Sequence, residues 1–341
     1  MSNMQNNLTV SLSPHVQDRD SVSNVMWTVN LALLPALLVS VLNFGIRVLA
    51  VNAAAVLAAV LTEYLVSRFM LKREPRISDG SAVLTGLLLA FNVPAGIPFW
   101  QVITGAVFAI GVAKMAFGGL GHNPFNPALA GRAFMLVSFP ADMSRWPAVA
   151  SGVLSWNVDA ASSATPLARL AESGTADLPG YLDLFLGRMS GSMGEISALA
   201  ILVGGIYLLW KKVISPEIPL LFLGTLALFT GIFWLIDPSM YADPLFHLLS
   251  GGAMLGAWFM ATDMVTSPMT FKGRAVYAVS IGLLTGIIRL FGSYPEGVSY
   301  AILIMNAFTP IIDKYIVPRR FGINKPAVLP QAPREPAGGE K

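Results

Sequence analysis

The feature that most constrains this chain is a series of apolar runs that recur from one end to the other. A helix needs about 20 apolar residues to cross the hydrocarbon core of a bilayer, and several of the runs approach or exceed that length. The 341 residues are 55% hydrophobic and only 12% charged, roughly half the charge of an ordinary soluble domain. The sequence therefore predicts an all-α polytopic membrane protein.

Apolar windows and their polar breaks predict about ten transmembrane helices. They cover residues 25–44, 48–66, 80–93, 98–117, 125–139, 196–210, 219–236, 245–262, 275–291 and 298–316. Several windows are short, and the third, fifth and eighth follow clusters of Gly, Pro or Asn. Such interruptions are typical of half-helices or broken helices around a buried site.

The placement of Lys and Arg predicts the orientation, because basic loops stay in the cytoplasm. One set of loops and the tail hold Arg68, Lys72, Arg73, Arg76, Lys211, Lys212, Lys272, Arg274, Lys314, Arg319, Arg320 and Lys325. The predicted organisation is a cytoplasmic segment (1–24), a first membrane repeat (25–139), an extracytoplasmic loop (140–195), a second membrane repeat (196–320) and a disordered cytoplasmic tail (321–341). Both termini are thus expected in the cytoplasm.

The two membrane halves resemble each other faintly. Residues 81–92 align without gaps on 252–263, which pairs Asn92 with Asp263, and residues 132–134 align on 306–308. Five predicted spans separate the copies, so they would have opposite orientations, as in transporters that bind ligands near mid-membrane. The alternative is chance agreement between segments rich in Gly and Ala.

A polar stretch in the long loop, NVDAASSATPLARL at 157–170, is the first candidate site. The Thr165 hydroxyl lies among small residues that would not block a modifying enzyme, so it could accept a covalently attached group. Asp159 and Ser162 could accept the proton or hydrogen-bond the product. The alternative is an ordinary helix start or turn before Pro166.

Two further candidates lie at predicted helix breaks. GHNPFNPALAGRAF at 121–134 offers the amides of Asn123 and Asn126 to a heteroaromatic ring or a carbonyl; alternatively, it is only the capped start of the fifth helix. Asp263 ends the eighth span, where a carboxylate could serve an ion path or a polar ligand. The alternative for Asp263 is an exposed loop acid.

The remaining polar residues carry weaker signals. Glu63, Lys114 and Arg289 fall within or near spans, where snorkelling to a membrane interface would explain them. His122 is expected in a loop, since no second histidine lies at ligand spacing. The sequence has no cysteine for a disulfide or a thiolate-ligated cluster, and no phosphate loop, dinucleotide fingerprint, hydrolase elbow or metal-ligand cluster.

Four segments together resemble a known family. DAASSATPLA resembles the flavinylation motif of the membrane-embedded D subunit of the Rnf ion-translocating electron-transport complex, a family shared with the B subunit of the sodium-translocating NADH:quinone reductase. SDGSAVLTGLLLA (78–90), NPFNPALAGRAF (123–134) and ATDMVTSP (261–268) resemble the family's segments in the same order. The likeness covers nearly all of residues 20–320, with Ser163 at the motif's usual glycine and Met264 at a usual proline.

The resemblance implies a redox role. It implies that Thr165 carries FMN through a phosphoester bond, installed outside the cytoplasm by a flavin transferase. It also implies a noncovalent flavin, riboflavin in related proteins, which we place near Asn123, Asn126 and Asp263. The expected partners are iron–sulfur, NADH/flavin and second flavinylated subunits of a ferredoxin:NAD oxidoreductase in the bacterial cytoplasmic membrane, which moves Na⁺ or H⁺.

Two other functions remain open from the residues alone. A solute channel or transporter would use inverted repeats, broken helices and small residues equally well. A scaffold that only docks partner subunits would need no cofactor. Either way, the spans are expected to contact membrane lipid, and neither nucleic acid, a metal site nor a catalytic residue is predicted.

Overall fold

The regular elements of the computed structural model are all helices. It describes residues 21–147, 156, 163–292 and 296–317, and no strand occurs within them. Five helical stretches are long and apolar enough to cross a membrane: Val22–Phe44, Arg47–Met70, Phe99–Phe117, Glu217–Ile236 and Phe271–Phe291. Three shorter apolar helices accompany them: Ser81–Phe91, Pro127–Ser138 and Ala198–Trp210. The predicted all-α polytopic class is confirmed.

The first half of the chain supplies helices at all five predicted windows. They are α1 (Val22–Ala32) with α2 (Leu34–Phe44), α3 (Arg47–Leu65), α4 (Ser81–Phe91), α5 (Phe99–Phe108) and α6 (Pro127–Ser138). One π-helical turn extends α3 over Val66–Met70, and another extends α5 over Ala109–Lys114. The helix in the first window is divided at Leu33, two residues before Pro35, which has no backbone N–H.

The second half repeats this arrangement with one helix more strongly broken. Its helices are α10 (Ala198–Trp210), α11 (Glu217–Ile236), α12 (Pro244–Leu249), α13 (Ala253–Leu255), α14 (Phe271–Phe291) and α15 (Val298–Tyr315). A π-helical turn extends α13 over Gly256–Met260. Three short helices lie in the connection between the halves: α7 (Pro140–Met143), α8 (Pro166–Ser173) and α9 (Tyr181–Leu186).

The predicted helix breaks are confirmed at the third, fifth and eighth windows. The residues that precede α4 and α13, Gly80 and Gly252, are left-handed with φ of 80° and 70°. Glycine adopts this backbone readily because it has no Cβ. The fifth helix instead begins at Asn126–Pro127, where proline occupies the first helical position and lacks an N–H that would have no partner there.

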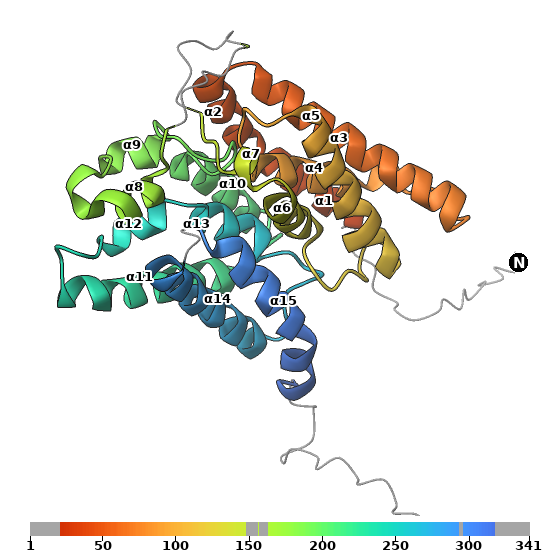
Figure 1. The fold of residues 1–341 in the computed structure, drawn as a ribbon. Coiled ribbons are helices and arrows are strands. Elements are labelled where there is room, and N and C mark those ends of the chain that lie inside the picture. The colour runs from red at the N-terminus through yellow and green to blue at the C-terminus, as the bar shows by residue number, and fades with distance from the viewer. Residues whose placement is uncertain (1–20, 148–155, 157–162, 293–295, 318–341) are drawn as a thin grey trace, which may run out of the picture.

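The two halves interlock and do not form separate bodies. In Figure 1 the first helices (red to yellow) lie on one side and α11, α14 and α15 on the other, with α6 and α13 between them. Helix α10 of the second half packs against α1 and α2, and α6 packs against α15. Residues from both halves therefore meet in the middle of the molecule, where the candidate sites lie.

Small residues allow the closest helix pairs to touch through their backbones, as is common in membranes. In the α3–α4 pair, a Cβ added at Gly86 would lie 2.7 Å from the Cα of Val56. In the α11–α14 pair, a Cβ at Gly282 would lie 2.7 Å from the carbonyl oxygen of Phe222. Neither backbone can move aside without shifting a helix.

We expect Gly86→Val to destabilise the protein by about 1–3 kcal/mol, because its side chain would overpack the α3–α4 contact. The matched control is Gly224→Ala on α11, where nothing lies within 4 Å of an added Cβ; that change should be close to neutral. Thermal unfolding in detergent, followed by the loss of the monodisperse peak, measures both. Equal midpoints for the two variants would contradict the close packing.

Candidate functional site

Three of the residues singled out in the sequence line one cavity, here called the first cavity. Asn123, Asn126 and Asp263 come from the start of α6 and the end of the broken eighth helix. Ser81, Thr85 and Lys114 also line it. Ser81 and Asn126 lie at the starts of α4 and α6, so these helix breaks bring polar groups to the cavity.

The two asparagines have different local roles. The Asn126 Oδ1 atom accepts from the backbone N–H groups of Ala128 and Leu129 at 3.1 and 3.3 Å, so Asn126 caps α6. Its amide nitrogen donates to the Met260 carbonyl at 3.4 Å. Asn123 donates to the Phe125 carbonyl at 3.0 Å, but its buried Oδ1 has no hydrogen-bond partner. Asn123 is thus the better candidate for contact with a ligand.

Asp263 is half-buried just beyond the last helical residue of the eighth span, and it is not the exposed loop acid that we also considered. Its carboxylate accepts from the Val265 N–H at 3.3 Å and from the Thr266 hydroxyl at 3.2 Å. Burial raises the pKa of the Asp263 carboxyl above its ordinary value, against the lowering effects of these hydrogen bonds and of the Lys114 charge. The first cavity therefore holds donors, acceptors and both signs of charge.

The volume of the first cavity is about 80 Å³, whereas small-molecule sites usually measure about 300–1,000 Å³. Its polar groups suit the edge of a heteroaromatic ring, but a tricyclic ring fits only if the apolar side of the cavity moves. That side includes Met26, Leu208 and Phe259.

Snorkelling is the wrong explanation for Glu63, Lys114 and Arg289. Lys114 is 1% exposed; its Nζ lies 2.7 Å from a Glu63 carboxylate oxygen and 2.7 Å from the Ser81 hydroxyl. Arg289 is also buried and donates to the carbonyls of Ser250 and Gly251 at 2.9 and 2.8 Å. Each cation finds partners at the start of a broken helix, so neither needs to reach the interface.

A second cavity, of about 450 Å³, adjoins Thr165. Its lining comes from α6, from the connection between the halves and from the start of α15. The lining residues that matter below are Arg132, Trp146, Ser163, Thr165, Glu296, Ser299 and Tyr300. A cavity of this volume falls within the range of small-molecule sites.

Thr165 is the N-cap of α8, in agreement with the predicted helix start before Pro166. Its Oγ1 accepts from the Ala168 N–H at 3.2 Å, and Pro166 occupies the first helical position. The side chain is buried, at 7% exposure, between α8 and the second cavity. Leu167, two residues on, packs with Phe246 of α12, which ties the start of α8 to the broken eighth helix.

Ser163 fits its position without backbone strain. Among the residues that the structure describes, only Lys72 and Lys212 combine a positive φ with a side chain. The backbone at position 163 therefore does not require glycine. Its N–H donates to the Trp146 carbonyl at 2.9 Å, and its hydroxyl accepts from Ser190 at 2.9 Å. Asp159 and Ser162, the other two candidates in this stretch, lie outside the described residues.

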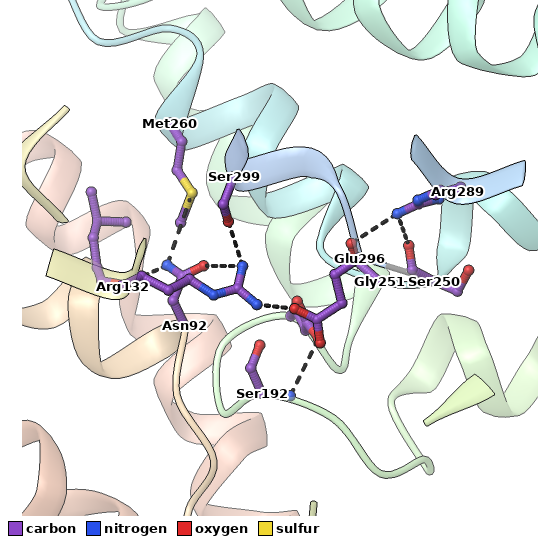
Figure 2. Close-up of polar contacts among 11 residues, drawn as sticks. Asn92, Arg132, Ser192, Ser250, Gly251, Met260, Arg289, Glu296 and Ser299 are labelled. Carbon is purple, nitrogen blue, oxygen red and sulfur yellow. Dashed lines mark hydrogen bonds and ion pairs between the residues drawn. The ribbon is translucent and has the colours of Figure 1, made fainter. Parts of the chain in front are cut away.

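A buried polar network forms the inner wall of the second cavity (Figure 2). The Arg132 guanidinium donates to the Ser299 hydroxyl at 2.5 Å and to the Asn92 side-chain oxygen at 3.4 Å, and it forms an ion pair with Glu296. Its Nε atom is buried without a hydrogen-bond partner. Glu195 is also buried, and one of its carboxylate oxygens accepts from the Ser192 N–H at 3.3 Å.

Helices α6 and α15 correspond under the predicted repeat. With the offset of 174 residues, Arg132 of α6 matches Asn306 of α15. Arg132 reaches the start of α15, and the Asn306 amide, in its hydrogen-bonded orientation, reaches the Asn126 N–H at the start of α6. Each of the two helices therefore sends one polar side chain to the N-terminus of the other.

The sequence missed this second set of residues. The ion pair joins Arg132 and Glu296 across 164 positions, which no local pattern reveals. Arg132 belongs to the 121–134 motif, and the predicted repeat pairs it with Asn306. That pairing is the one feature of the sequence that singles out Arg132. His122 lies exposed in a turn, as expected. Within the part of the chain that the structure describes, no cluster of three or more His, Cys, Asp or Glu could hold a metal.

Comparison with known proteins gives a consistent result. Residues 9–322 match the model of the NQR2, RnfD, RnfE family. The chain is 46% identical over 321 residues to the D subunit of the Na⁺-translocating ferredoxin:NAD⁺ oxidoreductase complex of Acetobacterium woodii, covering 94% of this chain and 96% of the relative. It is 46% identical over 330 residues to the D subunit of the proton-translocating ferredoxin:NAD⁺ oxidoreductase complex of Clostridium ljungdahlii, covering 94% and 98%.

A third relative, the D subunit of the ion-translocating oxidoreductase complex of Cronobacter sakazakii, is 38% identical over 344 residues, covering 92% of this chain and 98% of the relative. The matched region spans both membrane halves and both cavities. The chain therefore belongs to the NQR2, RnfD, RnfE family, the family that its four motifs resemble.

Proposed function

We propose that this protein is the membrane subunit of an ion-translocating ferredoxin:NAD oxidoreductase complex and relays electrons through FMN bound covalently to Thr165. The observation that carries the proposal is the position of Thr165 at a cavity of about 450 Å³, large enough for a flavin ring. The names of the relatives supply the reaction and the complex.

The surroundings of Thr165 suit a phosphoester. A phosphate on its Oγ1 would lie at the N-terminus of α8, where unpaired N–H groups and the helix dipole favour negative charge. Pro166 removes one N–H there, and the Ala168 N–H already points at Oγ1. When bound, a flavin supplies transfer of one or two electrons, chemistry that this cysteine-free chain could not obtain from a thiolate-ligated cluster of its own.

The orientation is part of the proposal. Basic loops place both termini in the cytoplasm and residues 140–195 outside it, where a flavin transferase would modify Thr165. The expected partners in the complex are iron–sulfur, NADH/flavin and second flavinylated subunits. The two relatives with the same identity to this chain are named for different ions, so the proposal covers Na⁺ or H⁺ without a choice between them.

A second flavin, riboflavin, is proposed at the first cavity. Asn123 and Asp263 line this cavity and offer polar groups to a ring edge, and Lys114, held by Glu63 and Ser81, adds a positive charge to its wall. Because the cavity measures about 80 Å³, binding requires the apolar side at Met26, Leu208 and Phe259 to open. The alternative function, a solute channel or transporter, would use the same broken helices without either flavin.

Thr165→Val should abolish the covalent flavin, because it removes the acceptor oxygen and keeps the shape of the side chain. Protein made together with a flavin transferase is denatured, separated on a gel and examined for flavin fluorescence. Thr165→Ser and Ser163→Gly should remain fluorescent, since both keep a hydroxyl at residue 165. A wild-type band without fluorescence would refute the flavin relay and favour the transporter.

The topology predicts opposite accessibility for two exposed methionines. Met240 and Met269 are 64% and 86% exposed, and the chain has no cysteine. In right-side-out vesicles, Met240→Cys should react with a membrane-impermeant maleimide and Met269→Cys should not. Inside-out vesicles should reverse the pattern, and detergent should make both react. Labelling of Met269→Cys from outside would contradict the proposed orientation.

Asn123→Leu should release the noncovalent flavin and leave the covalent one in place, because it removes an acceptor from the first cavity only. Flavin set free by acid precipitation is quantified per mole of protein, and the gel fluorescence serves as the internal reference. Asn43→Leu, outside both cavities, is the control. Unchanged release from Asn123→Leu would place the second flavin elsewhere.

A further inference from the structure

The second cavity has a charged inner wall that faces the attachment point of the proposed flavin. Arg132 and Thr165 line the same cavity, although 33 positions separate them in the sequence. The side chain of Arg132 is 6% exposed and that of Glu296 is 20% exposed. The more deeply buried partner of the ion pair is therefore the cation, and its field is the less screened of the two.

Arg132 is held by the Glu296 carboxylate and by two uncharged acceptors, and the Glu195 carboxylate also acts on it. The uncharged acceptors are the Ser299 hydroxyl and the Asn92 amide oxygen. The Nε atom is fully buried and has no hydrogen-bond partner. Trp146 and Tyr300 add aromatic surface to the same cavity, and aromatic rings stack readily on one another.

We propose that the ring of the flavin on Thr165 binds inside the second cavity, and that Arg132 and Glu296 set its reduction potential in opposite directions. This inference rests on the proposed function. When a ring accepts one electron from the redox carriers of the complex without a proton, it gains one negative charge. A fixed cation beside the ring stabilises that charge, and a fixed carboxylate opposes it.

The alternative is a ring that extends away from the cavity, toward a partner subunit. A phosphoester bond to Thr165 is compatible with either arrangement of the ring. The volume of about 450 Å³ and the aromatic residues Trp146 and Tyr300 in the same lining as Thr165 favour the inward one.

The test is a spectroelectrochemical titration of the covalent flavin in the purified full-length protein. Arg132→Gln should lower the one-electron reduction potential and Glu296→Gln should raise it, each by at least a tenfold change in the equilibrium, about 59 mV. Arg132→Lys, which keeps the charge, should stay close to wild type. The control Arg145→Gln removes a positive charge at a side chain that is 74% exposed and should also leave the potential unchanged.

The outcomes separate the two proposals. Gel fluorescence of each variant first reports whether the flavin is attached, which tests the proposed function alone. With the flavin attached, equal potentials in all variants, or shifts of the same sign in Arg132→Gln and Glu296→Gln, would overturn the inference. If Arg132→Gln does not fold, because Glu296 is left unpaired, then Glu296→Gln and the double variant Arg132→Gln/Glu296→Gln still decide the sign.

Discussion

The membrane fold depends on two buried cations, each held at the start of a broken helix. A lone charge in apolar surroundings costs far more free energy than the whole stability of a protein. Lys114 is compensated by the Glu63 carboxylate and the Ser81 hydroxyl, and Arg289 by carbonyls that the break after α12 leaves without helical partners. Break and cation therefore require each other: either one alone would leave unsatisfied polar groups in the membrane.

The crossing of α6 and α15 links the two halves of the chain. Arg132 and Asn306 occupy equivalent positions, and each contacts the N-terminus of the other helix. The residues differ in charge, so the same backbone arrangement gives two electrostatic environments. Arg132 and Glu296, an ion pair, both line the second cavity. The first cavity is lined by Lys114, which pairs with Glu63, and by Asp263.

How far the sequence predicts this structure depends on whether the signal is local. Apolar length and the glycines at positions 80 and 252 predict the spans and their breaks, because helix ends are decided by neighbouring residues. Asn123, Asn126 and Asp263 were recognised because polar residues next to helix breaks are conspicuous. The Arg132–Glu296 pair and the burial of Lys114 could not be predicted in this way, since each depends on which helices pack together across long separations.

A series of polar contacts connects a residue that lines one cavity to a residue that lines the other. Arg132 of the second cavity donates to Asn92, whose amide contacts the Met260 sulfur at 3.9 Å (Figure 2). The Met260 carbonyl in turn accepts from Asn126 of the first cavity. Arg132 and Asn126, which line different cavities, are therefore linked through Asn92 and Met260. The predicted repeat pairs Asn92 with Asp263, so one residue of this pair takes part in the link and the other lines the first cavity.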